Sequence, residues 1–323
     1  MRRLAAALIL GLALPTSALA VESGTGAYLL GSRGLTAGFV PPPGVYISDS
    51  IVYLQSRTKT DISIGGVIVA DPSIEALVNL ASFTAVPDAP VFGGTPAISV
   101  LVPYVGVDMD FSGRFLGGPA SATLHDSEDG FGDIVVTPMI GWHSGYWNYS
   151  AAMSLYLPTG EYSTAVVKPR QNVFDVLSIS KNKFAVDPTL AVTWLNPKSG
   201  LEVNGAAGIT FSTINAATDY QTAPELHVEA AIGQHFPGGL VVGAAGYGYQ
   251  QLANDSGSGA EAFQAAVGAK SLKARVFGAG PVLGYATKIG DVGLNLQAKY
   301  FHEFGVKRRL KSDVFWLTGS VAF

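Results

Sequence analysis

The residues best placed to do chemistry are Glu225, His227 and Glu229, which alternate with apolar Leu226 and Val228. In a β-strand this spacing of two puts all three ionisable side chains on one face. Carboxylates on both sides of an imidazole favour its protonated form. Such a group could be a station for a cation or a polar solute in a pore. It could equally brace a wall, because the interiors of membrane barrels are polar for structural reasons.

A second candidate is the run His125-Asp126-Ser127, followed by Glu128 and Asp129. Some outer-membrane lipid enzymes use His and Ser on a barrel wall, so a hydrolase is one possibility. A catalytic triad is defined by geometry and not by adjacency in sequence, and a solvated acidic loop explains the same residues. We assign no catalytic residue, no metal site and no cofactor. The chain has no cysteine, which removes disulfides and thiol catalysis.

The elements that must position these residues are strands. The last ten residues, Val314–Phe323, alternate between an apolar face and a smaller, partly polar face, and the chain closes on an aromatic residue. The apolar face consists of Phe315, Leu317, Gly319, Val321 and Phe323. A terminal strand of this kind is typical of bacterial outer-membrane β-barrels, where it serves as a sorting signal.

About twelve such strands can be counted along the chain, an even number, as in bacterial single-chain barrels. From the fourth strand onward, short turns such as Ser144-Gly145 and Asn196–Gly200 alternate with longer loops, as at the two rims of a barrel. We expect loops at residues 112–130, 158–183 and 253–274. The prediction is an all-β fold: a transmembrane antiparallel up-and-down β-barrel with short periplasmic turns and long extracellular loops.

Residues 1–20 have the charge, apolar stretch and small-residue cleavage site of a secretory signal peptide. Residues 21–44 are rich in Gly and end in Pro41-Pro42-Pro43-Gly44, which bars strand pairing there. We interpret them as a lead-in that is periplasmic or lumenal, and residues 45–323 as the barrel. The formal net charge of −4 argues against a nucleic-acid partner.

Charged residues fall on the face opposite the apolar one in several strands. A basic side chain facing lipid at the bilayer midplane costs ~2–4 kcal/mol, so the polar face should line the lumen. The candidates for the lumen or a substrate path are Asp108, Asp110, Asp133, Asp187, Glu202, Asn204, Glu225, His227, Glu229 and Lys299. The facing of the Gly- and Tyr-rich strand Leu240–Gln251 is left open.

Six short segments, in order, resemble the outer-membrane family named for the MetA-pathway of phenol degradation. They are Pro41-Pro42-Pro43-Gly44-Val45-Tyr46, Gly130-Phe131-Gly132-Asp133, Leu157-Pro158-Thr159-Gly160-Glu161-Tyr162, Asn215-Ala216-Ala217-Thr218-Asp219-Tyr220 with Glu225-Leu226-His227, Gly246-Tyr247-Gly248-Tyr249-Gln250-Gln251 with Asp255, and Gly280-Pro281-Val282-Leu283-Gly284-Tyr285. The resemblance carries over no catalytic or ligand residue.

The resemblance implies an outer-membrane channel for passive uptake of small hydrophobic or aromatic compounds. The alternatives are an outer-membrane lipid-modifying enzyme and a structural barrel without transport. Expected partners are outer-membrane lipids and lipopolysaccharide, the barrel-assembly machinery at the strand that ends at Phe323, and small hydrophobic solutes. The basic cluster Lys307, Arg308, Arg309 and Lys311 could meet lipid phosphates, or could be merely solvated.

Overall fold

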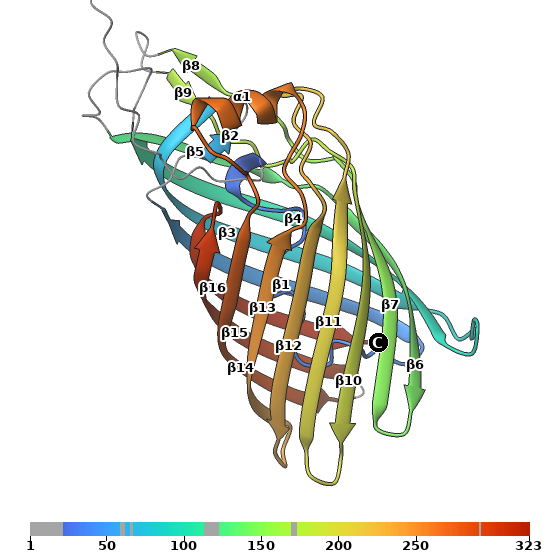
Figure 1. The fold of residues 1–323 in the computed structure, drawn as a ribbon. Coiled ribbons are helices and arrows are strands. Elements are labelled where there is room, and N and C mark those ends of the chain that lie inside the picture. Colours follow the sequence, from blue (N-terminus) through green and yellow to red (C-terminus); the bar gives the residue numbers. More distant parts are fainter. Residues whose placement is uncertain (1–21, 59–61, 65–66, 113–122, 169–172, 291) are drawn as a thin grey trace, which may run out of the picture.

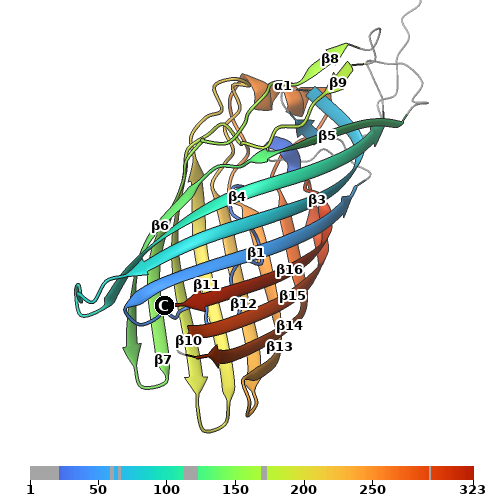
Figure 2. The same ribbon diagram turned by 180° about the vertical axis from the view of Figure 1, so that it is seen from behind.

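The computed structural model describes residues 22–58, 62–64, 67–112, 123–168, 173–290 and 292–323, and the expected signal peptide lies outside them. Twelve long antiparallel strands form a closed barrel (Figures 1 and 2). They are β1 (Gly44–Arg57), β3 (Val67–Val86), β4 (Thr95–Ser112), β6 (Val135–Ser144), β7 (Trp147–Tyr156), β10 (Ala185–Asn196), β11 (Leu201–Ser212), β12 (Glu225–His235), β13 (Leu240–Gln251), β14 (Arg275–Ile289), β15 (Val292–Lys307) and β16 (Lys311–Ala322). The predicted barrel is therefore confirmed.

The barrel closes where the first strand meets the last. β1 pairs with β16 along its whole length, from Tyr46 opposite Ala322 to Arg57 opposite Lys311, and with β3 on its other side. Phe323 extends this seam, since its N–H donates to the carbonyl of Val45 at 3.0 Å and its carbonyl accepts from the Val45 N–H at 3.4 Å. Closure pairs the first strand of the wall with the last, so within the described residues neither β1 nor β16 is left as an open edge.

The two rims differ, as the loop lengths predict. Tight connections join β6 to β7, β10 to β11, β12 to β13 and β14 to β15 at one rim, shown at the lower end of Figure 1. The other rim carries the longer connections and the short elements η1 (Glu22–Gly24), β2 (Ile62–Ile64), β5 (Thr123–Phe131), β8 (Val166–Lys168), β9 (Val173–Asp175) and α1 (Ser258–Ala266).

Four of these elements, β5, β8, β9 and α1, lie in regions that the sequence assigns to loops. β5 extends the sheet by pairing with the far end of β4, from Tyr104 opposite Phe131 to Ser112 opposite Thr123. Helix α1 buries only Ala260 and Phe263, too few residues to produce a clear helical pattern. No helix among the described residues is long and apolar enough to cross a bilayer.

Side-chain facing follows the expected alternation through most of the wall. On β10, for example, Leu190 is 68 % exposed on the outer face while Asp187 is fully buried on the inner face. The strand left unassigned, β13, turns Tyr247 and Tyr249 inward and leaves Val242 exposed. The outer surface of the wall is thus largely apolar and the inner surface carries the buried polar groups, as a lipid environment requires.

Candidate functional site: a filled lumen

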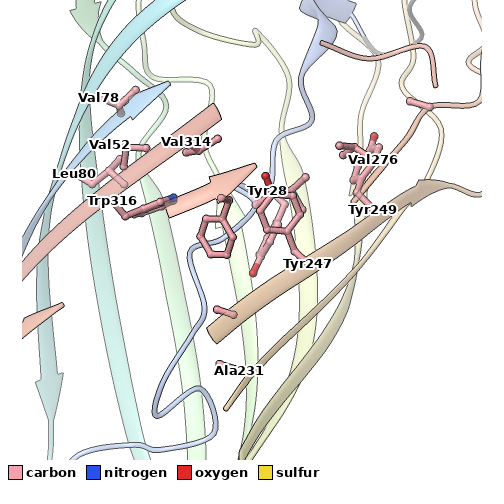
Figure 3. Packing of buried hydrophobic residues seen from close by; sticks show 14 of the residues in the cluster. Tyr28, Val52, Val78, Leu80, Ala231, Tyr247, Tyr249, Val276, Val314 and Trp316 are labelled. Atoms are coloured by element: carbon pink, nitrogen blue, oxygen red, sulfur yellow. The ribbon is translucent and has the colours of Figure 1, made fainter. Parts of the chain in front are cut away.

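The lumen is occupied by residues 22–43, here called the N-terminal segment. At the long-loop rim, the amide of Asn215 and the hydroxyl of Thr218 donate to the carboxylate of Glu22 at 3.0 and 2.6 Å. Farther along, the backbone N–H of Gly38 donates to Thr193 Oγ1 on β10 at 2.9 Å. The segment therefore runs through the barrel, and Figure 3 shows part of it crossing the interior beside Tyr28.

Tyr28 is a buried aromatic side chain of this segment. Its hydroxyl donates to Glu229 Oε1 at 2.8 Å, and the backbone N–H of Gly31 donates to the same oxygen at 3.1 Å. The phenol ring lies over the imidazole of His227, with ring centroids 3.5 Å apart and an interplanar angle of 13°. Two members of the Glu225, His227 and Glu229 cluster thus bind the N-terminal segment directly.

The opposite wall contributes Lys299 from β15. Its ammonium donates to the carbonyls of Gly31, Ser32 and Arg33 at 2.5, 3.2 and 3.4 Å. The same nitrogen lies 4.7 Å from the ring centre of Trp316, a cation–π distance. A buried cation is therefore satisfied by main-chain carbonyls that belong to the segment and not to the wall.

A second group of wall residues holds the segment nearer the short-turn rim. Glu202 Oε1 accepts the N–H of Thr36 at 2.5 Å, and Asn204 Oδ1 accepts the N–H of Ala37 at 3.1 Å. The other carboxylate oxygen of Glu202 lies 2.5 Å from His235 Nε2. These wall side chains pair with backbone groups of an irregular segment, which would otherwise be left without partners inside the barrel.

Asp187 is the centre of a further cluster of polar side chains on the wall. It accepts from the hydroxyls of Thr189 and Thr210 at 2.5 Å each, and its Oδ2 lies 2.9 Å from His227 Nε2. The neighbouring carboxylate, Glu225, accepts the hydroxyl of Tyr249. Within the described residues, Glu225 Oε2 and His227 Nδ1 are buried without a hydrogen-bond partner, so the lumen retains polar capacity that the protein does not use.

Three sequence-predicted candidates lie elsewhere. Asp108 and Asp110 project from the outer face of β4, with side chains 68 % and 59 % exposed, and Asp110 contacts His125 of β5 at 3.0 Å. The inner face at this level carries Met109 and Phe111, which pack in an apolar cluster with residues of the long loops. The apolar face turns inward here, so Asp108 and Asp110, which were predicted as lumen candidates, lie on the outer side of the sheet.

Asp133 lies at the long-loop rim, just before β6. One carboxylate oxygen accepts the N–H of Gly160 at 3.0 Å and the hydroxyl of Ser180 at 2.7 Å, and the other accepts the N–H of Lys181 at 3.0 Å. This residue ties two stretches of one long loop together. It therefore fixes the two ends of the described parts of this loop against the start of β6.

The structure also places the His125-Asp126-Ser127 run and the basic cluster at residues 307–311. Both nitrogens of the His125 imidazole face carboxylates, Nδ1 at 3.0 Å from Asp110 and Nε2 at 3.9 Å from Asp108, and Ser127 stands opposite Asp108 in the ladder. In the basic cluster, Arg309 is only 8 % exposed and its guanidinium lies 4.6 Å from the ring centre of Tyr249. Arg309 therefore faces the interior and not lipid phosphates.

The lumen as a whole has two unlike sides. Most of the buried polar side chains of the wall lie on β10, β11 and β12, whereas the wall opposite is largely apolar and aromatic, apart from Lys299 and Glu303 of β15. Figure 3 shows part of the apolar side. The apolar side includes Val52 of β1, Val78 and Leu80 of β3, Val282 of β14, Phe301 of β15, and Val314 and Trp316 of β16, in one cluster with Tyr28. Tyr28 had no signal in the sequence, because nothing in a Gly-rich stretch shows that it returns into the lumen.

A closed twelve-stranded barrel with an apolar outer wall and a polar-lined interior defines a bacterial outer-membrane β-barrel protein. Comparison with known structures agrees with this class. The COG4313 outer membrane channel from Pseudomonas putida F1 is similar with a TM-score of 0.64 at 15 % identity, over 88 % of this chain and 97 % of that one. The β domain of the Bordetella autotransporter BrkA is similar with a TM-score of 0.51 at 11 % identity, over 87 % of this chain and all of that domain.

The family model described as "MetA-pathway of phenol degradation" matches residues 57–319. The chain belongs to this family. No protein of curated function matches it in sequence. The protein is located in the bacterial outer membrane, as its barrel and family require.

Proposed function

We propose that this protein is an outer-membrane channel for passive uptake of small hydrophobic and aromatic compounds. The observation that carries the proposal is the two-sided lumen: carboxylates and an imidazole on β10–β12 face a largely aromatic and aliphatic wall on β1, β3 and β14–β16, in which Lys299 and Glu303 are the charged exceptions among the described residues. A molecule with an aromatic ring and one polar group can satisfy both sides at once. The family description, which refers to phenol degradation, supports the same class of solute.

The N-terminal segment makes this function conditional. It is held mainly by hydrogen bonds between its backbone and wall side chains, at Glu229, Lys299, Glu202, Asn204 and Thr193. No covalent link or regular sheet joins it to the wall between residue 22 and the start of β1 within the described structure. Passage of a solute therefore requires part of the segment to move, and the polar groups it leaves would line the path.

An enzymatic role has less support. Asp110 and Asp108 hold the imidazole of His125 on the outer face of the extended sheet, where all three side chains are more than half exposed. A general base needs a protected site and a nucleophile within hydrogen-bonding reach. We infer that this cluster is a solvated ladder between β4 and β5, and that the protein carries out no hydrolysis.

The remaining partner assignments follow from position. We propose that residues 1–20 direct export as a signal peptide and that the barrel-assembly machinery recognises the strand ending at Phe323. We also propose that lipids, including lipopolysaccharide, surround the outer wall. Of the basic cluster, Lys307, Arg308 and Lys311 remain candidates for contact with lipid phosphates, while Arg309 is buried in the interior.

A liposome-swelling assay tests the channel. Purified protein in vesicles should admit phenol and other small aromatic solutes faster than sugars of similar size. Protein-free vesicles correct for aromatic solutes that cross lipid unaided. Equal rates with and without protein for every solute would refute a transport function. Turnover of phospholipid that is lost in Ser127→Ala would instead establish the lipid-modifying enzyme.

A further inference from the structure

We propose that Tyr28 is a tethered phenol that occupies a binding site for free monophenols, and that such a solute binds by displacing it. The inference deepens the proposed function and rests on it for the class of solute. The site comprises the ring of His227, the carboxylate of Glu229 and the hydroxyl of Ser32.

The contacts of Tyr28 are those that a free phenol needs. Its ring stacks on His227 in near-parallel geometry, with centroids 3.5 Å apart. Its hydroxyl donates to Glu229 Oε1 at 2.8 Å and accepts from Ser32 Oγ at 3.1 Å, so both capacities of the phenolic oxygen are used. The tyrosine side chain beyond Cα is 4-methylphenol, and its contacts with the wall residues His227 and Glu229 do not depend on its attachment to the backbone.

The surroundings make the site specific for a ring with a hydroxyl. Tyr28 is 8 % exposed and belongs to the same apolar cluster as Tyr247 and Phe301, so any occupant loses its water. The Glu229 carboxylate is buried and needs a donor. A ring without a hydroxyl would leave that oxygen with only the Gly31 N–H, whereas a phenol restores both hydrogen bonds.

Tethering sets the concentration at which displacement occurs. A ligand on a short flexible link has an effective concentration on the order of mM. A free phenol must therefore compete with Tyr28 on that scale, and its binding would release the part of the segment around Leu30. The channel would then open when its own class of solute is abundant outside.

The experiment is chemical rescue of Tyr28→Ala in the full-length protein, with 4-methylphenol as the probe. We expect saturable binding by calorimetry in detergent, together with a higher temperature for the gel-mobility shift that reports barrel unfolding. Toluene should bind at least about tenfold more weakly, since it lacks the hydrogen bond to a charged group. Adding Glu229→Gln to Tyr28→Ala should weaken the binding of 4-methylphenol by a similar factor.

Tyr53→Ala is the matched control, because it removes a tyrosine from the outer wall and creates no lumenal cavity. It should show no saturable binding beyond that of detergent alone. Equal binding of toluene and 4-methylphenol to Tyr28→Ala, or the same binding to Tyr53→Ala, would overturn the proposal.

A second measurement covers the case in which Tyr28→Ala does not fold. The chain has no cysteine, so Leu30→Cys supplies a single thiol at a buried position of the segment. Labelling by a water-soluble thiol reagent should accelerate with 4-methylphenol and not with toluene. In the Tyr28→Phe background the same acceleration should need about tenfold less 4-methylphenol. An unchanged labelling rate at all phenol concentrations would exclude displacement.

Failure of this inference differs from failure of the channel. Rescue and displacement without phenol flux into vesicles would leave a phenol site in a protein that does not transport. Flux of aromatic solutes without rescue or displacement would leave a channel whose path avoids Tyr28.

Discussion

Gly208 of β11 lies between His227 and Thr189, and its lack of a side chain is what lets His227 reach Asp187 two strands away. A Cβ at position 208 would stand 2.5 Å from His227 Nε2 and would also clash with the Thr189 hydroxyl. The imidazole instead passes over Gly208, and its Nε2 lies 2.9 Å from Asp187 Oδ2. The stacking surface for Tyr28 therefore depends on a glycine of the neighbouring strand β11.

The variant Gly208→Ala should displace His227 and break its contact with Asp187. We expect a destabilisation of about 1–3 kcal/mol from overpacking, and faster labelling of Leu30→Cys because Tyr28 loses its partner. The temperature of the gel-mobility shift measures the first effect. Gly205→Ala is the matched control on the same strand, since its Cβ would meet Val192 at an ordinary 3.7 Å. Identical behaviour of the two variants would contradict the assigned role of Gly208.

Deleting residues 22–38 should open the lumen without unfolding the barrel. The wall keeps every strand pairing, because the segment joins none of them before β1 begins at Gly44. Single-channel recordings should show a larger and steadier conductance than those of the intact protein. The gel-mobility shift checks that the deleted protein is folded. A folded deletion variant with unchanged conductance would mean that another element closes the lumen.

Removing Phe323 should lower the folded yield in the outer membrane. The deletion eliminates the two hydrogen bonds between Phe323 and Val45 and takes an exposed aromatic side chain from the end of the seam. Each backbone hydrogen bond contributes only about 0.5–1.5 kcal/mol, so a large loss of yield would indicate recognition of the terminus during assembly. The fraction of heat-modifiable protein in outer-membrane preparations is the measurement. Phe323→Tyr, which keeps the ring and both hydrogen bonds, is the control.

Lys181 should make the long-loop rim more stable as the pH rises. Its pKa is lowered from 10.5 to about 8, mainly by burial and next by the nearby positive charge of Lys183, while the carboxylates of Glu22, Asp133 and Glu225 oppose the shift. The unfolded chain thus binds more protons than the folded one between about pH 8 and 10.5, so the free energy of unfolding contributed by this group increases with pH across that window. Its ammonium also donates to Thr25 Oγ1 of the N-terminal segment at 2.8 Å.

In Lys181→Met the increase should be smaller, as measured by the unfolding temperature at several pH values within that window. Lys198→Met provides the comparison, because Lys198 is exposed in the short turn between β10 and β11. A profile in Lys181→Met that is unchanged from that of the original protein would show that some other group causes the pH dependence.

The sequence by itself determined the wall. Alternation along strands such as Val314–Phe323 identifies the outer face, because polar side chains are strongly disfavoured where they face lipid. This constraint acts on each strand separately, so the residue pattern of a single strand is enough to show it. For the same reason it placed Asp187, Glu202, Glu225 and Glu229 on the polar side. It failed for Asp108 and Asp110, since beyond the bilayer the penalty disappears and Met109 can turn inward.

Only the tertiary structure decided what fills the barrel. Strand periodicity carries no information about which distant segment returns to the lumen, so the partnership of Tyr28 with His227 and Glu229, some 200 residues away, had no local signal. The Pro-rich stretch at 41–43 indicated that no strand pairing occurs there, and left open whether residues 21–44 lie in the periplasm or in the lumen. Their position was set by the need of buried carboxylates and Lys299 for partners, which is a property of the assembled barrel and not of any one strand.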